Sequence, residues 1–95
     1  MILHIVNRSP FTHTALQQCL RALGDGDSII LIEDAVLLLS SPASTSTLPP
    51  SDRLYVLQPD CEARGVALNT EVATPADYSR FVELVAQHSQ TVSWF

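Results

Sequence analysis

The chain has 95 residues, of which 46% are hydrophobic and 16% are charged, and its net charge is −5 at neutral pH. This length fits one small domain, and so low a charged fraction is typical of a protein that buries surface in an oligomer. The basic residues are scattered arginines, which argues against direct nucleic-acid binding. We see neither a secretory leader nor a membrane-spanning run, and expect one cytoplasmic domain over residues 1–95.

The first segment combines a strand pattern with a helix start. Residues 2–6 (ILHIV) are mainly apolar and β-branched, which is typical of a buried strand. Ser9 is a favourable N-cap and Pro10 suits the first helical position, so together they predict the start of a helix. Apolar residues share one side of a helical wheel over residues 11–23, and glycines follow, which predicts an amphipathic helix that ends there.

A second strand and a low-complexity segment come next. Residues 28–33 (SIILIE) contain apolar residues without alternation, as expected for a central strand covered on both faces. Residues 34–39 predict either a short helix capped by Asp34 or a continuing strand, and we favour the helix. Residues 40–51 are rich in Ser, Thr and Pro and bury too little apolar surface to become ordered, so we expect a flexible loop.

The second half of the chain repeats the alternation of strands and helices. Residues 53–57 (RLYVL) predict a third strand, and a short helix begins at Gln58 and stops at Gly65. Residues 70–73 predict a short fourth strand.

A second amphipathic helix is predicted near the end of the printed sequence. Thr74–Asp77 combine an N-cap threonine, a proline at the first helical position and an acid at the third. The apolar residues that follow share one face of this helix: Tyr78, Phe81, Val82, Leu84 and Val85. Residues 90–95 (QTVSWF) then predict a last strand.

Strands that alternate with helices predict an α/β fold, a small three-layer α/β/α sandwich with a mostly parallel sheet. In such sheets the functional groups lie beyond the carboxyl ends of the strands. We therefore expect polar side chains to meet at one edge from three segments: Asn7–Ser9, Glu33–Asp34 and Gln58–Asp60.

Few residues have the spacing that catalytic or ligand-binding motifs require. The chain has no glycine-rich phosphate loop and no CxxC pair, and its histidines lack metal spacing, so we expect neither cofactor nor metal. His4 lies in the first strand and is interpreted as a core histidine with satisfied hydrogen bonds.

Glu33 and Asp34 suit acid–base chemistry, but we favour Asp34 as a helix cap and Glu33 as a solvated side chain. Near them, Asp60, Glu62 and Arg64 are interpreted as solvating a short helix.

The two cysteines also favour a structural interpretation when judged by pattern. A reactive thiol is usually stabilised at a helix N-terminus or beside cations. Cys19 is well inside its predicted helix and central on the apolar face, which favours a buried small side chain. Cys61 is isolated in the short helix that follows the third strand.

Several stretches resemble the TusB/DsrH family. They are ILHIVNRSPF, the helix that carries Cys19, and GDGDSIILIEDAV after it. The resemblance continues through LYVLQPDCEARG (54–65), DYSRFVELV (77–85) and VSWF (92–95), and covers nearly the whole chain except the 40–51 loop. It implies a DsrE-like three-layer fold. The DG that often follows the second strand of the family is Asp34-Ala35 here, which puts in doubt a tight turn that requires glycine.

Members of this family are small subunits of bacterial sulfur-relay complexes. The resemblance implies an accessory, non-catalytic subunit that joins TusC- and TusD-like subunits in a heterohexamer, a dimer of heterotrimers. Such a complex takes persulfide sulfur from a TusA-like carrier and passes it towards a TusE-like carrier for 2-thiolation of the tRNA wobble uridine. The alternative branch is a DsrH-type subunit of a dissimilatory sulfur-oxidation complex.

The resemblance leaves open whether this chain is itself an enzyme, because the main relay cysteine belongs to the TusD/DsrE-type subunit. Cys19 matches a cysteine in the first helix of DsrH-type members, although some TusB members lack it. Cys19 is therefore the candidate catalytic residue, and a sulfur carrier that acts through Cys19 is the second hypothesis. A module that binds and regulates an unrelated enzyme is the third.

Overall fold

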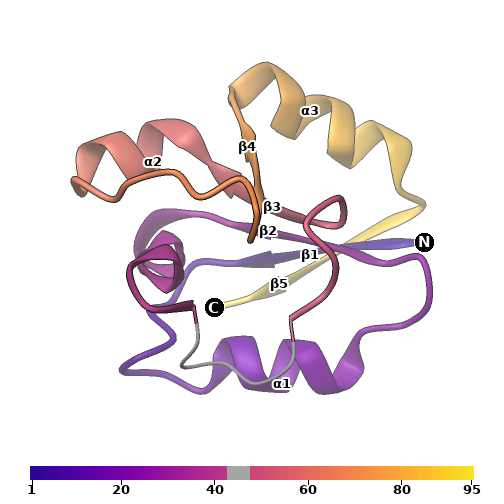
Figure 1. Ribbon diagram of the computed structural model, residues 1–95. Helices are drawn as coiled ribbons and strands as arrows, with labels where there is room; N and C mark the ends of the chain where they lie inside the picture. The colour runs from indigo at the N-terminus through magenta and orange to yellow at the C-terminus, as the bar shows by residue number, and fades with distance from the viewer. Residues whose placement is uncertain (43–47) are drawn as a thin grey trace.

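The computed structural model describes residues 1–42 and 48–95 of the chain. Strands and helices alternate in the predicted order (Figure 1). The strands are β1 (Ile2–Val6), β2 (Ser28–Leu31), β3 (Leu54–Leu57), β4 (Thr74–Ala76) and β5 (Gln90–Trp94). The helical elements are α1 (Ala15–Ala22), the 3₁₀ helix η1 (Glu33–Ser40), α2 (Gln58–Ala63) and α3 (Tyr78–Gln87).

The five strands form one parallel sheet in the order β4-β3-β2-β1-β5. Helix α1 lies on one face of this sheet and α3 on the other (Figure 1), so the predicted α/β/α architecture is confirmed. Because η1 directly follows β2 and α2 directly follows β3, both elements begin at the carboxyl edge of the sheet. Functional groups in parallel sheets collect at this edge.

Strands β2 and β3 are buried on both faces and divide their side chains between two cores. Leu31 and Val56 belong to the core on the α1 side, whereas Ile30 and Tyr55 belong to the core under α3. Successive side chains of a strand point to opposite faces, so an uninterrupted apolar run fills both cores. The structure thus confirms the expectation of a central strand covered on both sides.

The first helix begins later than the capping pattern predicted. Ser9 Oγ accepts a hydrogen bond from the Phe11 N–H at 3.2 Å, and the Ser9 carbonyl accepts one from the His13 N–H at 3.1 Å. These bonds form a turn, and α1 starts only at Ala15, so the predicted N-cap at Ser9 is wrong. Serine side chains cap turns as well as helices, which explains the error. Helix α1 buries two members of its predicted apolar face, Leu16 and Cys19.

The segment Thr74–Ala76 forms the edge strand β4 rather than a first helical turn. It pairs in parallel with β3, and Pro75 is tolerated because an edge strand need not donate every backbone N–H. The N-cap of α3 is Asp77, whose side chain accepts a hydrogen bond from the Arg80 N–H at 2.7 Å. The predicted helix start and the predicted strand over residues 70–73 are therefore wrong, because sheet pairing prevails over the local capping pattern.

Residues after β2 form the 3₁₀ helix η1, which confirms the helical alternative for residues 34–39. The N-cap position of η1 is Ile32, without a side-chain capping bond, so the predicted cap by Asp34 is wrong. Within the predicted flexible loop over 40–51, residues 43–47 lie outside the described residues. Leu48, just after them, packs against the core on the α1 side.

Candidate functional site

Polar side chains from three strand ends meet at the carboxyl edge of the sheet. Asn7 follows β1, Glu33 follows β2, and Asp60 lies in α2 shortly after β3. Asn7 Nδ2 donates to Glu33 Oε2 at 3.4 Å, and the Glu33 backbone N–H donates to Asp60 Oδ2 at 2.6 Å. The structure therefore brings together the three segments that the sequence predicted at this edge.

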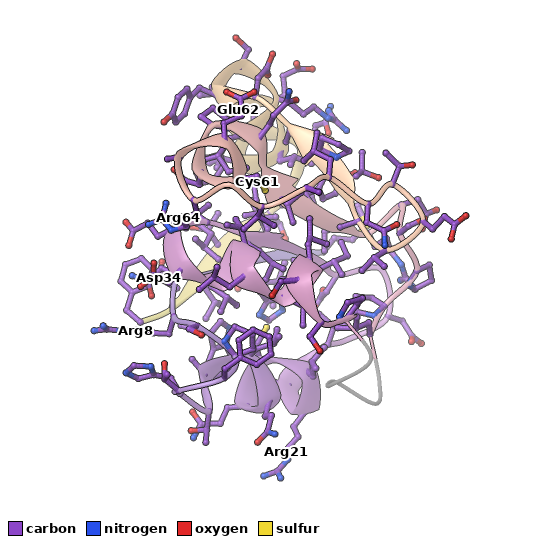
Figure 2. All side chains as sticks on the ribbon, turned by 60° about the vertical axis from the view of Figure 1, so that its left-hand side comes forward. Arg8, Arg21, Asp34, Cys61, Glu62 and Arg64 are labelled. Atoms are coloured by element: carbon purple, nitrogen blue, oxygen red, sulfur yellow. The ribbon has the colours of Figure 1, made fainter. Side chains whose placement is uncertain are left out.

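Asp34 and Arg64 complete a group that we call the edge cluster: Asn7, Glu33, Asp34, Asp60 and Arg64. Arg64 Nε lies 3.0 Å from Asp34 Oδ1, and Arg64 also donates to the Asp60 carbonyl at 3.4 Å. Figure 2 shows Asp34, Arg64 and Arg8 on the same side of the molecule. Arg64 thus joins α2 to η1 rather than only solvating its own helix, although an exposed pair of this kind contributes at most about 1 kcal/mol.

The edge cluster lacks the arrangement of an acid–base or metal centre. Glu33 contacts Asn7 and Asp34 contacts Arg64, so different partners engage the two carboxylates. Both acids are exposed, which confirms the favoured interpretation of Glu33 as a solvated side chain. Within residues 1–42 and 48–95, no three His, Cys, Asp or Glu residues are grouped in a way that could hold a metal ion.

Glu33 has an unusual backbone conformation at this edge of the sheet. Among the described residues it is the non-glycine residue with a positive φ, +50°, a conformation that side chains with a Cβ rarely adopt. Its N–H bond to Asp60 holds it there. The turn after β2 therefore places its left-handed residue at Glu33, and Ala35 lies within η1.

We expect Glu33→Gly to be more stable than Glu33→Ala by about 1 kcal/mol in urea unfolding at neutral pH. Both variants lose the contact with Asn7, so the comparison isolates the strain of a Cβ at positive φ. Equal stability of the two variants would show that the backbone at this position is unstrained in solution.

Cys19 lies in the core on the α1 side of the sheet and is 0% exposed. Burial, reinforced by the nearby Asp27 carboxylate, raises the pKa of its thiol to about 12. The nucleophilic form of cysteine is the thiolate, so at neutral pH this side chain is almost entirely in its unreactive form. Arg21 of the same helix does not lower the pKa of Cys19, because it projects outward from α1 (Figure 2).

Cys61 enters the same core from α2 and is 1% exposed. Burial raises the pKa of its thiol, Asp60 and Glu62 add to the effect, and Arg64 partly opposes it. Both cysteines are free thiols in the structure. Their environments are those of small apolar side chains rather than of the electropositive, accessible sites where reactive thiols are found.

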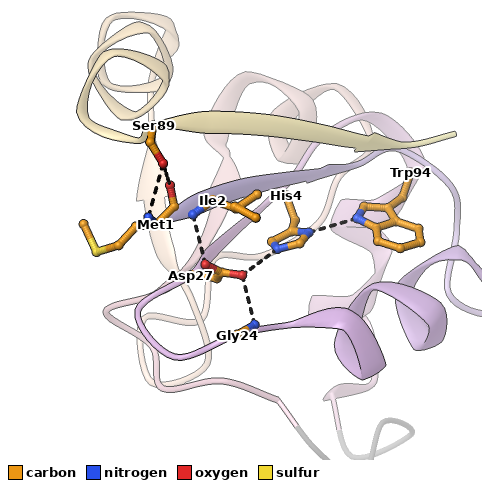
Figure 3. Close-up of polar contacts among 7 residues, drawn as sticks. All are labelled: Met1, Ile2, His4, Gly24, Asp27, Ser89 and Trp94. Carbon is orange, nitrogen blue, oxygen red and sulfur yellow. Dashed lines mark hydrogen bonds and ion pairs between the residues drawn. The ribbon is translucent and has the colours of Figure 1, made fainter.

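His4 is 2% exposed and is hydrogen bonded at both ring nitrogens, which confirms its interpretation as a satisfied core histidine (Figure 3). Nε2 lies 3.0 Å from Asp27 Oδ2, and Trp94 Nε1 donates to Nδ1 at 3.0 Å. The sequence analysis missed both partners. They are 23 and 90 positions from His4, beyond the reach of any local pattern.

Asp27 accepts two further hydrogen bonds from the backbone. The Ile2 N–H donates to Oδ1 and the Gly24 N–H donates to Oδ2, each at 2.9 Å (Figure 3). Burial by itself would raise the pKa of Asp27, but the hydrogen bonds from His4 and from these N–H groups lower it to about 2. Asp27 is therefore an anion that joins β1 to the end of the α1–β2 loop.

Helix α3 buries less of its predicted apolar face than the wheel implied. Leu84 is 1% exposed, whereas Tyr78 is 61% and Val82 is 70% exposed. A shallow apolar groove runs along this helix, lined by Phe81, Val82, Val85 and Ala86. Contiguous exposed apolar surface of this kind is typical of sites of protein–protein contact.

No helix within the described part of the chain is both long and apolar enough to cross a membrane.

Comparison with known proteins finds one family, whose members match this chain over nearly its full length. The family model described as "DsrH like protein" matches residues 8–91. Protein TusB of Pectobacterium parmentieri is 36% identical over 97 residues, which cover 98% of this chain and 100% of the relative. Protein TusB of Serratia proteamaculans is 36% identical over 96 residues, and Protein TusB of Pectobacterium atrosepticum is 34% identical over 97, with the same coverage.

Proposed function

The chain belongs to the TusB/DsrH family, and from this premise we propose that it is the TusB-type subunit of a cytoplasmic sulfur-relay complex. Full-length similarity to proteins named TusB is the observation that carries the proposal. In the proposed complex the chain joins TusC- and TusD-like subunits as a dimer of heterotrimers. Sulfur arrives from a TusA-like carrier, leaves to a TusE-like carrier, and ends as 2-thiouridine at the tRNA wobble position.

The burial of both thiols supports an accessory role for this subunit. In a relay step, a thiolate attacks the outer sulfur of the donor persulfide, and the S–S bond of the donor breaks. The donor leaves as a thiolate, and the attacking cysteine becomes the new persulfide. Because Cys19 and Cys61 are buried with raised pKa values, we place the attacking cysteine on a partner subunit.

The surface of α3 supports the proposed assembly. A chain with few charges and an exposed apolar helix face buries that face favourably against another subunit. Val82 and Tyr78, exposed in the isolated chain, are available for such a contact.

The test is to purify the chain together with the TusC- and TusD-like chains of the same genome and to supply a persulfide donor. Intact mass of each subunit then reports which one gains a sulfur atom. We expect the sulfur on a partner, and we expect a Cys19→Ala complex to transfer sulfur at the rate of the unmodified complex. Sulfur on Cys19 at the rate of overall transfer would instead establish this chain as a carrier.

Deletion of the gene separates the two branches of the family. We expect loss of tRNA 2-thiouridine, restored by the unmodified gene and by a Cys19→Ala gene. Unchanged 2-thiouridine with failure of sulfur oxidation would favour the DsrH-type alternative, for which the match to the DsrH-like family model is the supporting observation. Failure to co-purify with any TusC- or TusD-like chain would contradict both branches.

A further inference from the structure

The hydrogen bonds of His4 define where its proton lies. The indole N–H of Trp94 can only donate, so the Nδ1 atom that receives it must be unprotonated. The proton of the neutral ring is then on Nε2, which donates to Asp27 Oδ2. The His4 and Trp94 ring planes differ by 25°, an orientation in which the indole N–H can lie close to the plane of the imidazole lone pair.

We propose that His4 is a pH-dependent switch that holds the carboxyl end of β5 on the sheet through Trp94 and releases it when the ring gains a second proton. An imidazolium ring carries N–H groups at both nitrogens. Two N–H donors would then face each other across the present 3.0 Å contact between Trp94 Nε1 and His4 Nδ1. The hydrogen bond cannot survive, and one of the two side chains must move.

Trp94 moves rather than His4, because the other side of the ring is held more firmly. Asp27 is fixed by the N–H groups of Ile2 and Gly24, and protonation turns its contact with His4 into a pair of opposite charges. Trp94 is only half-buried, and it lies at the end of β5, at the edge of the sheet, where β1 is its neighbour.

The groups that face His4 from the neighbouring elements keep their charge between roughly pH 5 and pH 8. Its strand neighbours, Ile29 of β2 and Val92 of β5, are apolar. The low pKa of Asp27, about 2, keeps this carboxylate charged, and the high pKa of Cys19 on α1, about 12, keeps the thiol neutral. The basic residue of α1, Arg21, points away from the sheet (Figure 2).

Trp94 is the single tryptophan of the chain, so intrinsic fluorescence reports its release directly. The purified full chain is titrated from roughly pH 8 to pH 5, the range in which histidine side chains gain a proton. We expect one reversible transition to longer emission wavelength, with increased quenching by acrylamide and unchanged far-ultraviolet circular dichroism. Emission that stays constant over this range would overturn the proposal.

Matched variants assign the transition to His4. His4→Gln keeps a donor for Asp27 and an acceptor for the Trp94 N–H but cannot be protonated in this range, so we expect no transition. His13→Gln, at an exposed position before α1, should keep the transition of the unmodified chain. A transition that persists in His4→Gln, or that disappears in His13→Gln, would contradict the assignment.

Nuclear magnetic resonance on the unmodified chain keeps the proposal testable if His4→Gln does not fold. The indole N–H of Trp94 should lose its protection from solvent exchange in step with the titration of the His4 ring protons. A Trp94 indole that stays protected after His4 has titrated would exclude the switch.

Discussion

Replacement of Asp27 by Asn is expected to destabilise the chain by about 3 kcal/mol in urea unfolding at pH 7. The carboxylate accepts the His4 Nε2–H and the N–H groups of Ile2 and Gly24, with both of its oxygens engaged. An amide has only one oxygen, so at least one of these three donors loses its acceptor. This loss is large for a domain whose total stability is on the order of 5–15 kcal/mol.

Asp25→Asn is the matched control, because Asp25 is two positions away in the same loop but exposed. We expect this substitution to change stability by less than about 0.5 kcal/mol. Equal stability of the two variants would show that the buried hydrogen bonds of Asp27 contribute nothing in solution.

The same carboxylate predicts a specific loss of stability in acid. The pKa of Asp27 is lowered from 3.8 to about 2, so its contribution is fully present above about pH 4 and disappears as the pH falls towards 2. The shift corresponds to about 2 kcal/mol. Unfolding free energies of the unmodified chain should fall by this amount over that range, beyond any fall seen with Asp27→Asn.

Leu84→Ala is expected to destabilise the chain by about 3 kcal/mol. Leu84 is the buried residue of α3, at 1% exposure, and it belongs to the core with Leu3, Ile30 and Tyr55. Truncation leaves a cavity at the contact that docks α3 onto the sheet. Urea unfolding followed by circular dichroism measures the loss, at a concentration where the chain is monomeric.

Val82→Ala is the control on the same helix, since Val82 is 70% exposed. We expect a change within about 0.5 kcal/mol, because no core contact is lost and alanine favours the helix. If Val82→Ala were as damaging as Leu84→Ala, the exposed side of α3 would have to be covered in solution, and the oligomeric state of the sample would show by what.

Predictions from local pattern succeeded where a short stretch alone decides the outcome. The apolar run of residues 28–33 predicted a strand covered on both faces, which the structure confirms over Ser28–Leu31. The alternation of strands and helices predicted the layered sheet that the structure has. The wheel of the first helix correctly placed Leu16 and Cys19 inside. The same reasoning brought Glu33 and Asp60 to one edge, because parallel strands end together.

Other features were decided only when distant segments met. Thr74–Ala76 carries a good helix-start pattern, yet it pairs with β3, because a strand partner satisfies its backbone better than a helical turn would. The amphipathic face of α3 was recognisable from the sequence, but the sheet buries only part of that face. Val82 therefore stays exposed, and only the tertiary structure shows this. Asp27, His4 and Trp94 come from a loop and two different strands, and none of the three has a local signature that predicts these contacts. Hydrophobic periodicity is a property of neighbours along the chain, whereas buried hydrogen bonds are a property of neighbours in space.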